Sequence, residues 1–344
     1  MAPRSGTRPF SQKTITDVAQ RAGVSISTVS RVINQSAPVS SNLENKVKAA
    51  IAELDYRPQT AARALAGQKT HTIGLLLAEI GTDFYPLMIR AIEAEARKNH
   101  FNLLINVAGD DTSIEGEIPY TLGEYNSDGV LVFPASLSDD ELYRMHLNNF
   151  PVVLVQRRPP AGLEFPCITI ENKLPARKMV DHLIEVHGFR RIAFLSGLAD
   201  HEDARRREQG YHESLESHGI PYDPTIVAQG YFQKQASQDA VCEWITAGFE
   251  FDAIFACDDI SAIGALSALN RAGLNVPNDV AVVGFDDIEV SRFLSPPLTT
   301  VKVPIQEIGR AAIQQLLAFM NGEVPDMCTH FETELVIRRS CGCR

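Results

Sequence analysis

The most informative part of the sequence is Thr14 to Asn34, which reads TITDVAQRAGVSISTVSRVIN. Thr14 is a residue type that caps helix N-termini, and Asp17 places a favourable negative charge in the first turn. Apolar residues then recur at helical spacing until Gly23, which suits a turn with positive φ. Ser25 is a second capping residue ahead of another helical pattern. The stretch therefore predicts two short helices joined by a glycine turn.

A third helix is expected after Ser40 and Ser41, where apolar residues recur at helical spacing up to Leu54. Two short helices braced by a third form a helix-turn-helix, whose second helix fits the DNA major groove, about 12 Å wide. Four outward positions of that helix are expected to touch DNA: Ile26, Ser27, Ser30 and Arg31. Hydroxyls at a helix N-terminus suit phosphates, and an arginine suits a guanine edge or a phosphate. Geometry alone leaves a generic three-helix bundle as the alternative.

The distribution of charge favours a nucleic-acid partner at one end of the chain. The net charge of the whole sequence is −11. Residues 1–69 carry ten Lys and Arg against four Asp and Glu, a net +6 that leaves −17 for the remainder. Unless this clustering arose by chance, a small basic domain on an acidic body indicates a protein that binds a polyanion with one part only.

Residues 14–34 resemble the signature of the lactose-repressor (LacI/GalR) family of transcriptional regulators, and the resemblance continues through residues 39–40 and 52–58. It implies that Ile26 and Ser27 help to select the operator sequence. It also implies that a set of polar residues supports docking or holds phosphates: Thr14, Ser25, Thr28, Ser30, Asn34 and Ser40. The DNA-binding domain is predicted over residues 13–57, after a disordered basic arm over residues 1–12.

Residues 58–69 are predicted to form a hinge. Pro58–Gly67 reads PQTAARALAG, and a helix this short is marginal in water unless a partner supplies contacts. The segment is similar to the family's hinge motif at Ala62, Arg63 and Leu65. The resemblance implies that two hinge helices of a dimer enter the minor groove, where Leu65 wedges between base pairs. A plain linker is the alternative.

From residue 70 to residue 344 the pattern alternates between strands and helices. Apolar runs such as Ile73–Leu77 and Val152–Val155 predict buried parallel strands, and a second series begins after residue 170. The expected fold class is therefore α/β, with doubly wound parallel sheets in two lobes, one over residues 72–168 plus 298–326 and the other over 169–297. The resemblance extends over this region and implies a body like that of periplasmic binding proteins.

The cleft between the two lobes is predicted to bind a small-molecule effector. By resemblance, Arg207 and Asp286 match the family's effector-binding arginine and aspartate, which suit hydroxyl groups or a carboxylate. Phe84, Tyr85 and Phe232 match positions that form apolar walls or stack on a ring.

Two positions in the predicted cleft depart from the family pattern. Asp258 stands where asparagine is usual, and Gln156 where aspartate is frequent. The identity of the effector therefore does not follow from any relative. A sugar or a sugar acid is expected, and the run Arg205–Arg207 permits a gluconate-like acid.

Two other classes of function compete with a DNA-binding repressor. One is a sugar-binding protein of the same body fold without a DNA role, which the basic first domain and the lack of a secretory signal oppose. The other is an enzyme, because the adjacent acids Asp258-Asp259 and Asp286-Asp287 suit acid/base work. No nucleophile-elbow or phosphate-loop motif accompanies them, so no catalytic residue and no cofactor is predicted.

The cysteines and the last residues complete the expectations. Cys341 and Cys343 form a lone C-x-C without the second ligand pair of a zinc site, so no metal site is predicted and their role stays open. The cysteine pattern fits a reducing cytoplasm, and no apolar run is long enough for a transmembrane helix. Residues 338–344 lack the leucine heptad helix of the family's tetramers, so a homodimer on a palindromic operator is expected.

Overall fold

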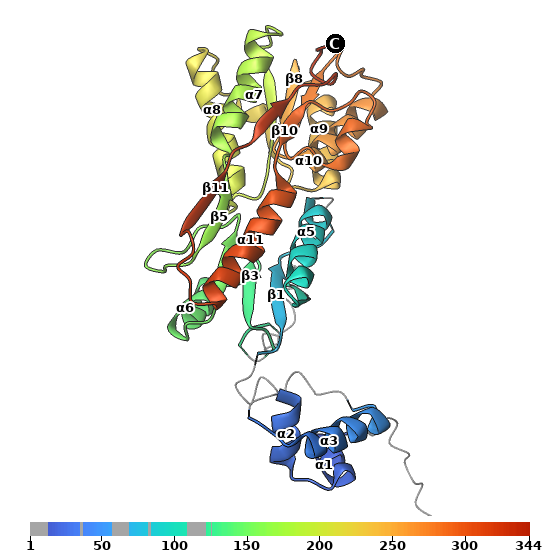
Figure 1. The fold of residues 1–344 in the computed structure, drawn as a ribbon. Helices are drawn as coiled ribbons and strands as arrows, with labels where there is room; N and C mark the ends of the chain where they lie inside the picture. Colours follow the sequence, from blue (N-terminus) through green and yellow to red (C-terminus); the bar gives the residue numbers. More distant parts are fainter. Residues whose placement is uncertain (1–12, 35–36, 57–68, 82–83, 109–121, 125) are drawn as a thin grey trace, which may run out of the picture. The chain divides into compact units, whose positions relative to one another are not determined.

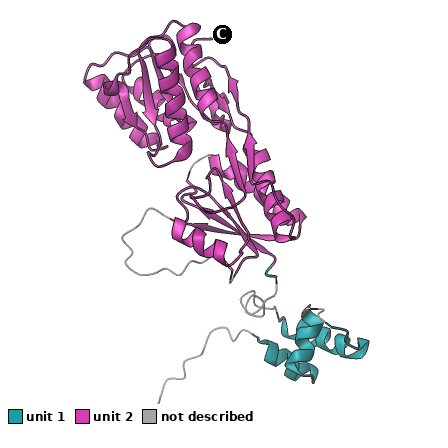
Figure 2. Ribbon diagram, turned by 90° about the vertical axis from the view of Figure 1, so that its left-hand side faces the viewer, with its two compact units in different colours: residues 1–70 teal, residues 71–344 magenta. Residues whose placement is uncertain are grey.

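The structure is a computed structural model that describes residues 13–34, 37–56, 69–81, 84–108, 122–124 and 126–344. It divides into two compact units, residues 1–70 and residues 71–344 (Figure 2). The predicted arm over residues 1–12 and the predicted hinge residues Ala62, Arg63 and Leu65 lie outside the described residues. None of the helices in the described ranges is both long enough and apolar enough to cross a membrane.

The first unit contains three helices around a small apolar core. They are α1 (Ile15–Ala22), α2 (Ile26–Asn34) and α3 (Ser41–Leu54). Each helix contributes a fully buried valine to the core: Val18, Val29 and Val47. The three-helix arrangement predicted from the apolar periodicity is therefore present.

Local sequence signals set the ends of the first two helices. The Thr14 hydroxyl accepts a bond from the Asp17 N–H, and the Asp17 carboxylate accepts one from the Thr14 N–H at 2.7 Å, which forms the reciprocal capping box. Gly23 has φ 66°, the left-handed conformation predicted for the turn. The Ser25 hydroxyl accepts from the Thr28 N–H at 3.2 Å at the start of α2.

The first lobe of the second unit is built on a six-stranded sheet of order β11-β5-β4-β3-β1-β2, in which all neighbours are parallel. Its strands are β1 (Thr72–Leu77), β2 (Asn102–Val107), β3 (Gly129–Val132), β4 (Val152–Val155), β5 (Cys167–Ile170) and β11 (Cys328–Phe331). The helices are α5 (Phe84–Lys98), α6 (Asp139–Leu147) and α11 (Ile305–Met320). Figure 1 shows α11 beside α5, where the two helices pack together.

The second lobe is built on a parallel four-stranded sheet of order β7-β6-β8-β9. Its strands are β6 (Ile192–Ser196), β7 (Val227–Gln229), β8 (Ala253–Ala256) and β9 (Ala281–Val283). Its helices are α7 (Lys173–Glu185), α8 (Glu202–Ser217), α9 (Lys234–Thr246) and α10 (Asp259–Arg271), with the short 3-10 turns η1 (Pro224–Ile226) and η2 (Glu289–Arg292). α7 packs on α8 and α9 packs on α10, so the doubly wound α/β prediction is confirmed.

The chain passes between the lobes more often than the predicted boundaries allowed. It returns to the first lobe through β10 (Thr300–Lys302), which pairs antiparallel with β12 (Glu334–Val336). The first lobe was expected to end at residue 326, but β11 lies beyond that point and pairs with β5. The last residues lie on the second lobe, because the Val282 N–H donates to the Ser340 carbonyl at 3.0 Å. The first lobe therefore extends beyond its predicted limit at residue 326. Local sequence patterns could not set this limit, because β11 joins the sheet through its pairing with β5, a strand that is distant in the sequence.

Candidate effector cavity and nucleic-acid interface

The start of α2 exposes the residues that the sequence assigns to operator selection. Ile26 has an exposed fraction of 48%, which is large for an isoleucine, and Ser27 is exposed beside it. The Ser25 hydroxyl hydrogen-bonds the Ser27 hydroxyl at 2.8 Å and that of Thr28 at 2.9 Å. The helix is fixed from behind by the buried Val29. An apolar side chain and hydroxyls are thus presented together at a helix N-terminus, an arrangement that suits base methyl groups and phosphates.

The other DNA-binding residues predicted in the first unit differ in their exposure and in their hydrogen bonds. Arg31 is exposed on α2, and Ser30 is half-buried. Thr14 is engaged in the capping box of α1, while Ser40 is the exposed N-cap residue of α3 without a side-chain capping bond. Asn34 ends α2, and its side chain lies outside the described residues.

One cavity in the second unit brings together every residue that the sequence assigns to effector binding. The space it encloses, counted together with its opening to solvent, is about 540 Å³. The seven predicted residues all line it: Phe84, Tyr85, Gln156, Arg207, Phe232, Asp258 and Asp286. They come from both lobes, most of them from loops after strands or from helix starts and Arg207 from within α8, because the carboxyl ends of parallel strands meet at this edge.

Arg207 is the best-fixed polar side chain of the cavity. Its guanidinium donates to Asn172 Oδ1 at 2.8 Å and to the Cys257 carbonyl at 2.7 Å, and it lies 3.7 Å from the centre of the Phe285 ring. Its Nη2 atom is 3.3 Å from Asp286 Oδ1. Four constraints on one buried group hold it in a single orientation, so a ligand would meet it preorganised.

Backbone strain is concentrated at the strand ends that carry these side chains. Gln156, Phe232 and Asp286 all have positive φ angles, of 55°, 59° and 110°. Non-glycine residues adopt this region at a cost, which surrounding structure must offset. The strain directs three polar or aromatic side chains into the same cavity.

Burial controls the electrostatics of the cavity. Removal from water raises the pKa values of Asp203, Asp258 and Asp286, although the nearby Arg207 opposes the rise. Removal from water also lowers the pKa of His201, so its imidazole is neutral near pH 7. The cavity therefore offers carboxyl oxygens and a fixed guanidinium, a mixture that matches groups which both donate and accept hydrogen bonds, such as hydroxyls.

The adjacent acids that suggested an enzyme are divided between the cavity and the scaffold. Asp259 accepts bonds from the Ser291 hydroxyl at 2.6 Å, the Thr300 hydroxyl at 2.5 Å and the Ile288 N–H at 3.0 Å. Asp287 accepts from Arg338 at 2.6 Å. Only the first acid of each pair lines the cavity. Neither pair therefore places both of its carboxyl groups in the cavity.

The run of three arginines is also divided. Arg207 lines the cavity, Arg205 faces a neighbouring pocket together with Arg157 and Arg158, and Arg206 contributes to a third pocket. Successive helix residues point about 100° apart, so the three cannot act as one cluster. The sugar-acid expectation therefore lacks the joint cationic site on which it was based.

Five cavity residues were not singled out from the sequence: Glu79, His201, Asp203, Ile260 and Ile288. Asp203 lies four residues before Arg207 on α8, and this helical spacing was a usable signal. His201 caps the same helix, and its ring lies 5.3 Å from the Phe232 ring. Nothing in the local sequence of the two isoleucines distinguishes them from core residues.

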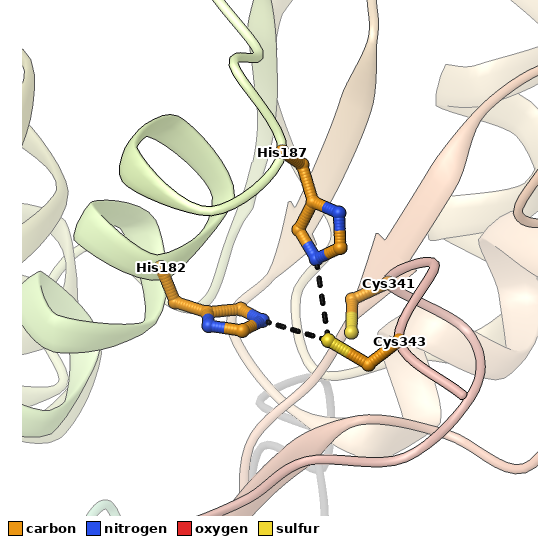
Figure 3. Close-up of side chains that lie close together, drawn as sticks. All are labelled: His182, His187, Cys341 and Cys343. Atoms are coloured by element: carbon orange, nitrogen blue, oxygen red, sulfur yellow. Dashed lines mark hydrogen bonds between the residues drawn. The ribbon is translucent and has the colours of Figure 1, made fainter.

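The interpretation of Cys341 and Cys343 as lacking partner ligands was wrong. The structure places His182 and His187 next to them, with the imidazole Nε2 atoms 3.6 Å and 3.5 Å from Cys343 Sγ (Figure 3). The histidines are far away in the sequence, so only the tertiary fold reveals the group.

Comparison with known proteins agrees with both units. The model for bacterial regulatory proteins of the lacI family matches residues 14–59, and a periplasmic binding protein-like domain matches residues 180–341. The HTH-type transcriptional regulator GalR of Escherichia coli (strain K12) is 34% identical over 328 residues, which cover 95% of each chain.

Two solved structures resemble nearly the whole chain. The transcriptional regulator CelR in complex with cellobiose is 32% identical with a TM-score of 0.69, over 96% of this chain and 100% of that one. The lac repressor dimer bound to operator and the anti-inducer ONPF is 26% identical with a TM-score of 0.76, over 96% and 99%. The chain therefore belongs to the lacI family of bacterial regulatory proteins.

Proposed function

We propose that this chain is a cytoplasmic transcriptional repressor, which binds a palindromic operator as a homodimer and releases or retains it according to a sugar bound in the body. The observation that carries the proposal is the single cavity lined by all seven predicted effector residues, in a chain whose first unit exposes Ile26 and Ser27 at a helix start. The solved dimer of the lac repressor on its operator supports the assembly.

The charges around the cavity favour a neutral sugar as the ligand. The lining residues include one arginine, Arg207, and four carboxyl groups, those of Glu79, Asp203, Asp258 and Asp286. A sugar acid would bring a further negative charge to a guanidinium that already faces Asp286. The rings of Phe84, Tyr85 and Phe232 supply apolar surface for a sugar ring. The cellobiose bound by CelR is in line with this ligand class.

Coupling between ligand and DNA follows from the two-lobed body. A ligand that contacts both lobes favours one relative arrangement of the lobes, and it shifts the population toward the state it binds better. If that arrangement sets the spacing of the two hinges in a dimer, the binding of sugar and the binding of operator are linked. The sugar then changes the affinity for the operator by a certain factor, and the operator changes the affinity for the sugar by the same factor. Leu65 and its neighbours in the predicted hinge are the residues that would carry this coupling to the minor groove.

The experiment uses the full-length chain in two steps. Genomic fragments bound by the chain are selected at fixed salt, since operator affinity depends strongly on ionic strength. Anisotropy titrations of the selected duplex are then repeated with each member of a panel of neutral sugars, sugar acids and purines. We expect one neutral sugar to change the operator Kd by about 5–150-fold, and Leu65→Ala to weaken operator binding while leaving sugar affinity unchanged.

Each competing function gives a different result in this experiment. A chain that binds a sugar but prefers no duplex over random competitor is a sugar-binding protein, not a regulator. Turnover of glycosides by the purified chain would instead indicate an enzyme. A shift produced only by gluconate-like acids would keep the repressor and reject the neutral sugar.

A further inference from the structure

Four side chains with metal-binding chemistry meet where the C-terminal segment crosses the end of α7. His182 lies in the last turn of α7, and His187 follows just after the helix. Cys341 and Cys343 come from the segment after β12. Figure 3 shows both imidazole rings pointing at the sulfur atom of Cys343, with that of Cys341 beside it. None of the four belongs to the effector cavity or to the first unit.

The distances from Cys343 Sγ to the two histidine nitrogens match an edge of a coordination tetrahedron. Each side chain offers one ligand atom, and all four of these atoms lie within 4.8 Å of one another. Bonds of ~2.3 Å to sulfur and ~2.0 Å to nitrogen at tetrahedral angles place sulfur about 3.5 Å from nitrogen. The two Nε2 atoms are 3.5 Å and 3.6 Å from Cys343 Sγ. One ion placed between these atoms therefore reaches all four with little side-chain movement.

We propose that His182, His187, Cys341 and Cys343 form a structural zinc site. Two thiolates and two imidazoles are the ligand set of many structural zinc sites, and the absence of carboxylate ligands from the set disfavours magnesium and calcium. Because four protein ligands leave no open coordination position, the site holds structure and does not activate water.

The surroundings support Cys341 as a ligand. It is fully buried, and the Thr299 hydroxyl donates to its sulfur at 3.2 Å. A hydroxyl bond of this kind orients a thiolate and balances its charge, as second-layer partners of metal sites do. Ser340, next to Cys341, links the C-terminal segment to the sheet of the second lobe, because its hydroxyl donates to the Val282 carbonyl on β9 at 2.6 Å.

Gly342 and Phe189 shape the remaining half of the group. Gly342 has φ 105°, and a Cβ atom there would lie 3.3 Å from the His187 ring, so glycine suits both the backbone turn and the close approach. The His187 ring stacks on Phe189 at a centroid distance of 5.4 Å and an interplanar angle of 18°. The C-x-C turn and the imidazole are thus shaped to fit each other.

A zinc ion here would tie the C-terminal segment to α7. The segment lies against strand β9 and follows β12, which pairs with the crossover strand β10. α7 packs on both β10 and β12. The ion would therefore add a link between the end of α7 and the segment that already bonds β9.

The test measures zinc directly in the full-length chain. The protein is made in zinc-supplemented medium without a polyhistidine tag, purified with reductant and without chelator, and analysed by mass spectrometry of the metal. We expect about one zinc per chain. After chelator treatment, added Co²⁺ is expected to give the intense visible bands of a tetrahedral ion and a thiolate-to-cobalt charge-transfer band. Chelation is also expected to lower Tm.

Matched variants separate this site from incidental binding. Cys343→Ser and His187→Gln are expected to lose most of the zinc, whereas the exposed Cys328→Ser and His212→Gln on α8 retain it. Should the first two variants fail to fold, the cobalt spectrum of the unaltered chain still decides. Absence of that spectrum, equal zinc in all variants, or no zinc in the purified unaltered chain would each overturn the proposal. None of these readouts depends on sugar or DNA binding.

Discussion

Arg207 and Asp286 lie 3.3 Å apart in the cavity, yet Asp286 Oδ1 is without a hydrogen-bond partner in the described part of the chain. The two groups are close enough for attraction between charges, but their geometry does not meet the criteria for a hydrogen bond. His201, which also lines the cavity, likewise has a buried Nδ1 atom without such a bond among the described residues. Buried polar atoms normally find partners, which supports the proposal that these two bind hydroxyl groups of a ligand.

Asp286→Asn tests the acceptor role of this carboxylate. The amide keeps the shape but removes the charge, and a hydrogen bond to a charged group is worth about 1.5–3 kcal/mol. We expect sugar affinity to fall about 10- to 100-fold with little change in Tm, measured by calorimetric titration with the sugar identified in the panel. The exposed Asp326→Asn serves as the control and should bind normally. Unchanged affinity in Asp286→Asn would remove this residue from the site.

Ile26→Ala tests operator selection. Since Ile26 is 48% exposed, its truncation should leave the helix bundle intact. Loss of a base contact is expected to reduce discrimination between operator variants by about 1–3 kcal/mol, with weaker effects on non-specific binding. Competition titrations with single-base operator variants measure this. Asn45→Ala, exposed on α3, is the control, and equal discrimination by both variants would contradict the assignment.

Gly210→Ala tests the packing of α8 on α7. A Cβ at Gly210 would lie 2.3 Å from the Lys173 carbonyl and 2.8 Å from the Arg177 nitrogen, both of them backbone atoms. Overpacking of this kind costs about 1–3 kcal/mol in the free energy of unfolding. Denaturant unfolding should show that loss, whereas Gly81→Ala, with open space around the new Cβ, should be close to neutral. If the two variants were equally stable, α7 and α8 would tolerate the added Cβ atom by moving apart, which would contradict the prediction.

His218→Gln tests a pH-dependent contribution to stability. The pKa of His218 is raised by its hydrogen bond to the Ser214 carbonyl and by Glu185, against a smaller lowering by burial. Because the folded protein binds this proton more tightly than the unfolded chain, the stabilisation is complete below pH 6.5 and disappears as pH rises through the folded pKa.

Glu185, one of the ion-pair partners of His218, is largely exposed to solvent, so the effect is expected to be about 1 kcal/mol or less. Thermal unfolding of the parent chain and of His218→Gln at pH 6 and pH 9 measures it. The difference in Tm between the two proteins should be larger at pH 6. A larger difference at pH 9 would contradict the sign of the shift.

The sequence by itself determined the elements whose signals are local. Thr14, Asp17 and Gly23 define α1 and its turn through contacts within a few residues, and apolar runs such as Thr72–Leu77 define buried strands. Family resemblance added the seven residues that the fold then brings to one cavity. Backbone propensity, capping and hydrophobic periodicity involve residues that are close in the sequence, so they can be recognised from the sequence alone.

Only the tertiary structure decided which distant residues meet. In the structure β11 pairs into the sheet of the first lobe. Asp258 lines the cavity whereas the adjacent Asp259 bonds the Thr300 hydroxyl, and Arg205 and Arg207 line different pockets. The tertiary structure also brought His187 to Cys343 across 156 residues of chain. Such contacts depend on how layers pack and where crossovers return, and a one-dimensional pattern contains no record of those distances.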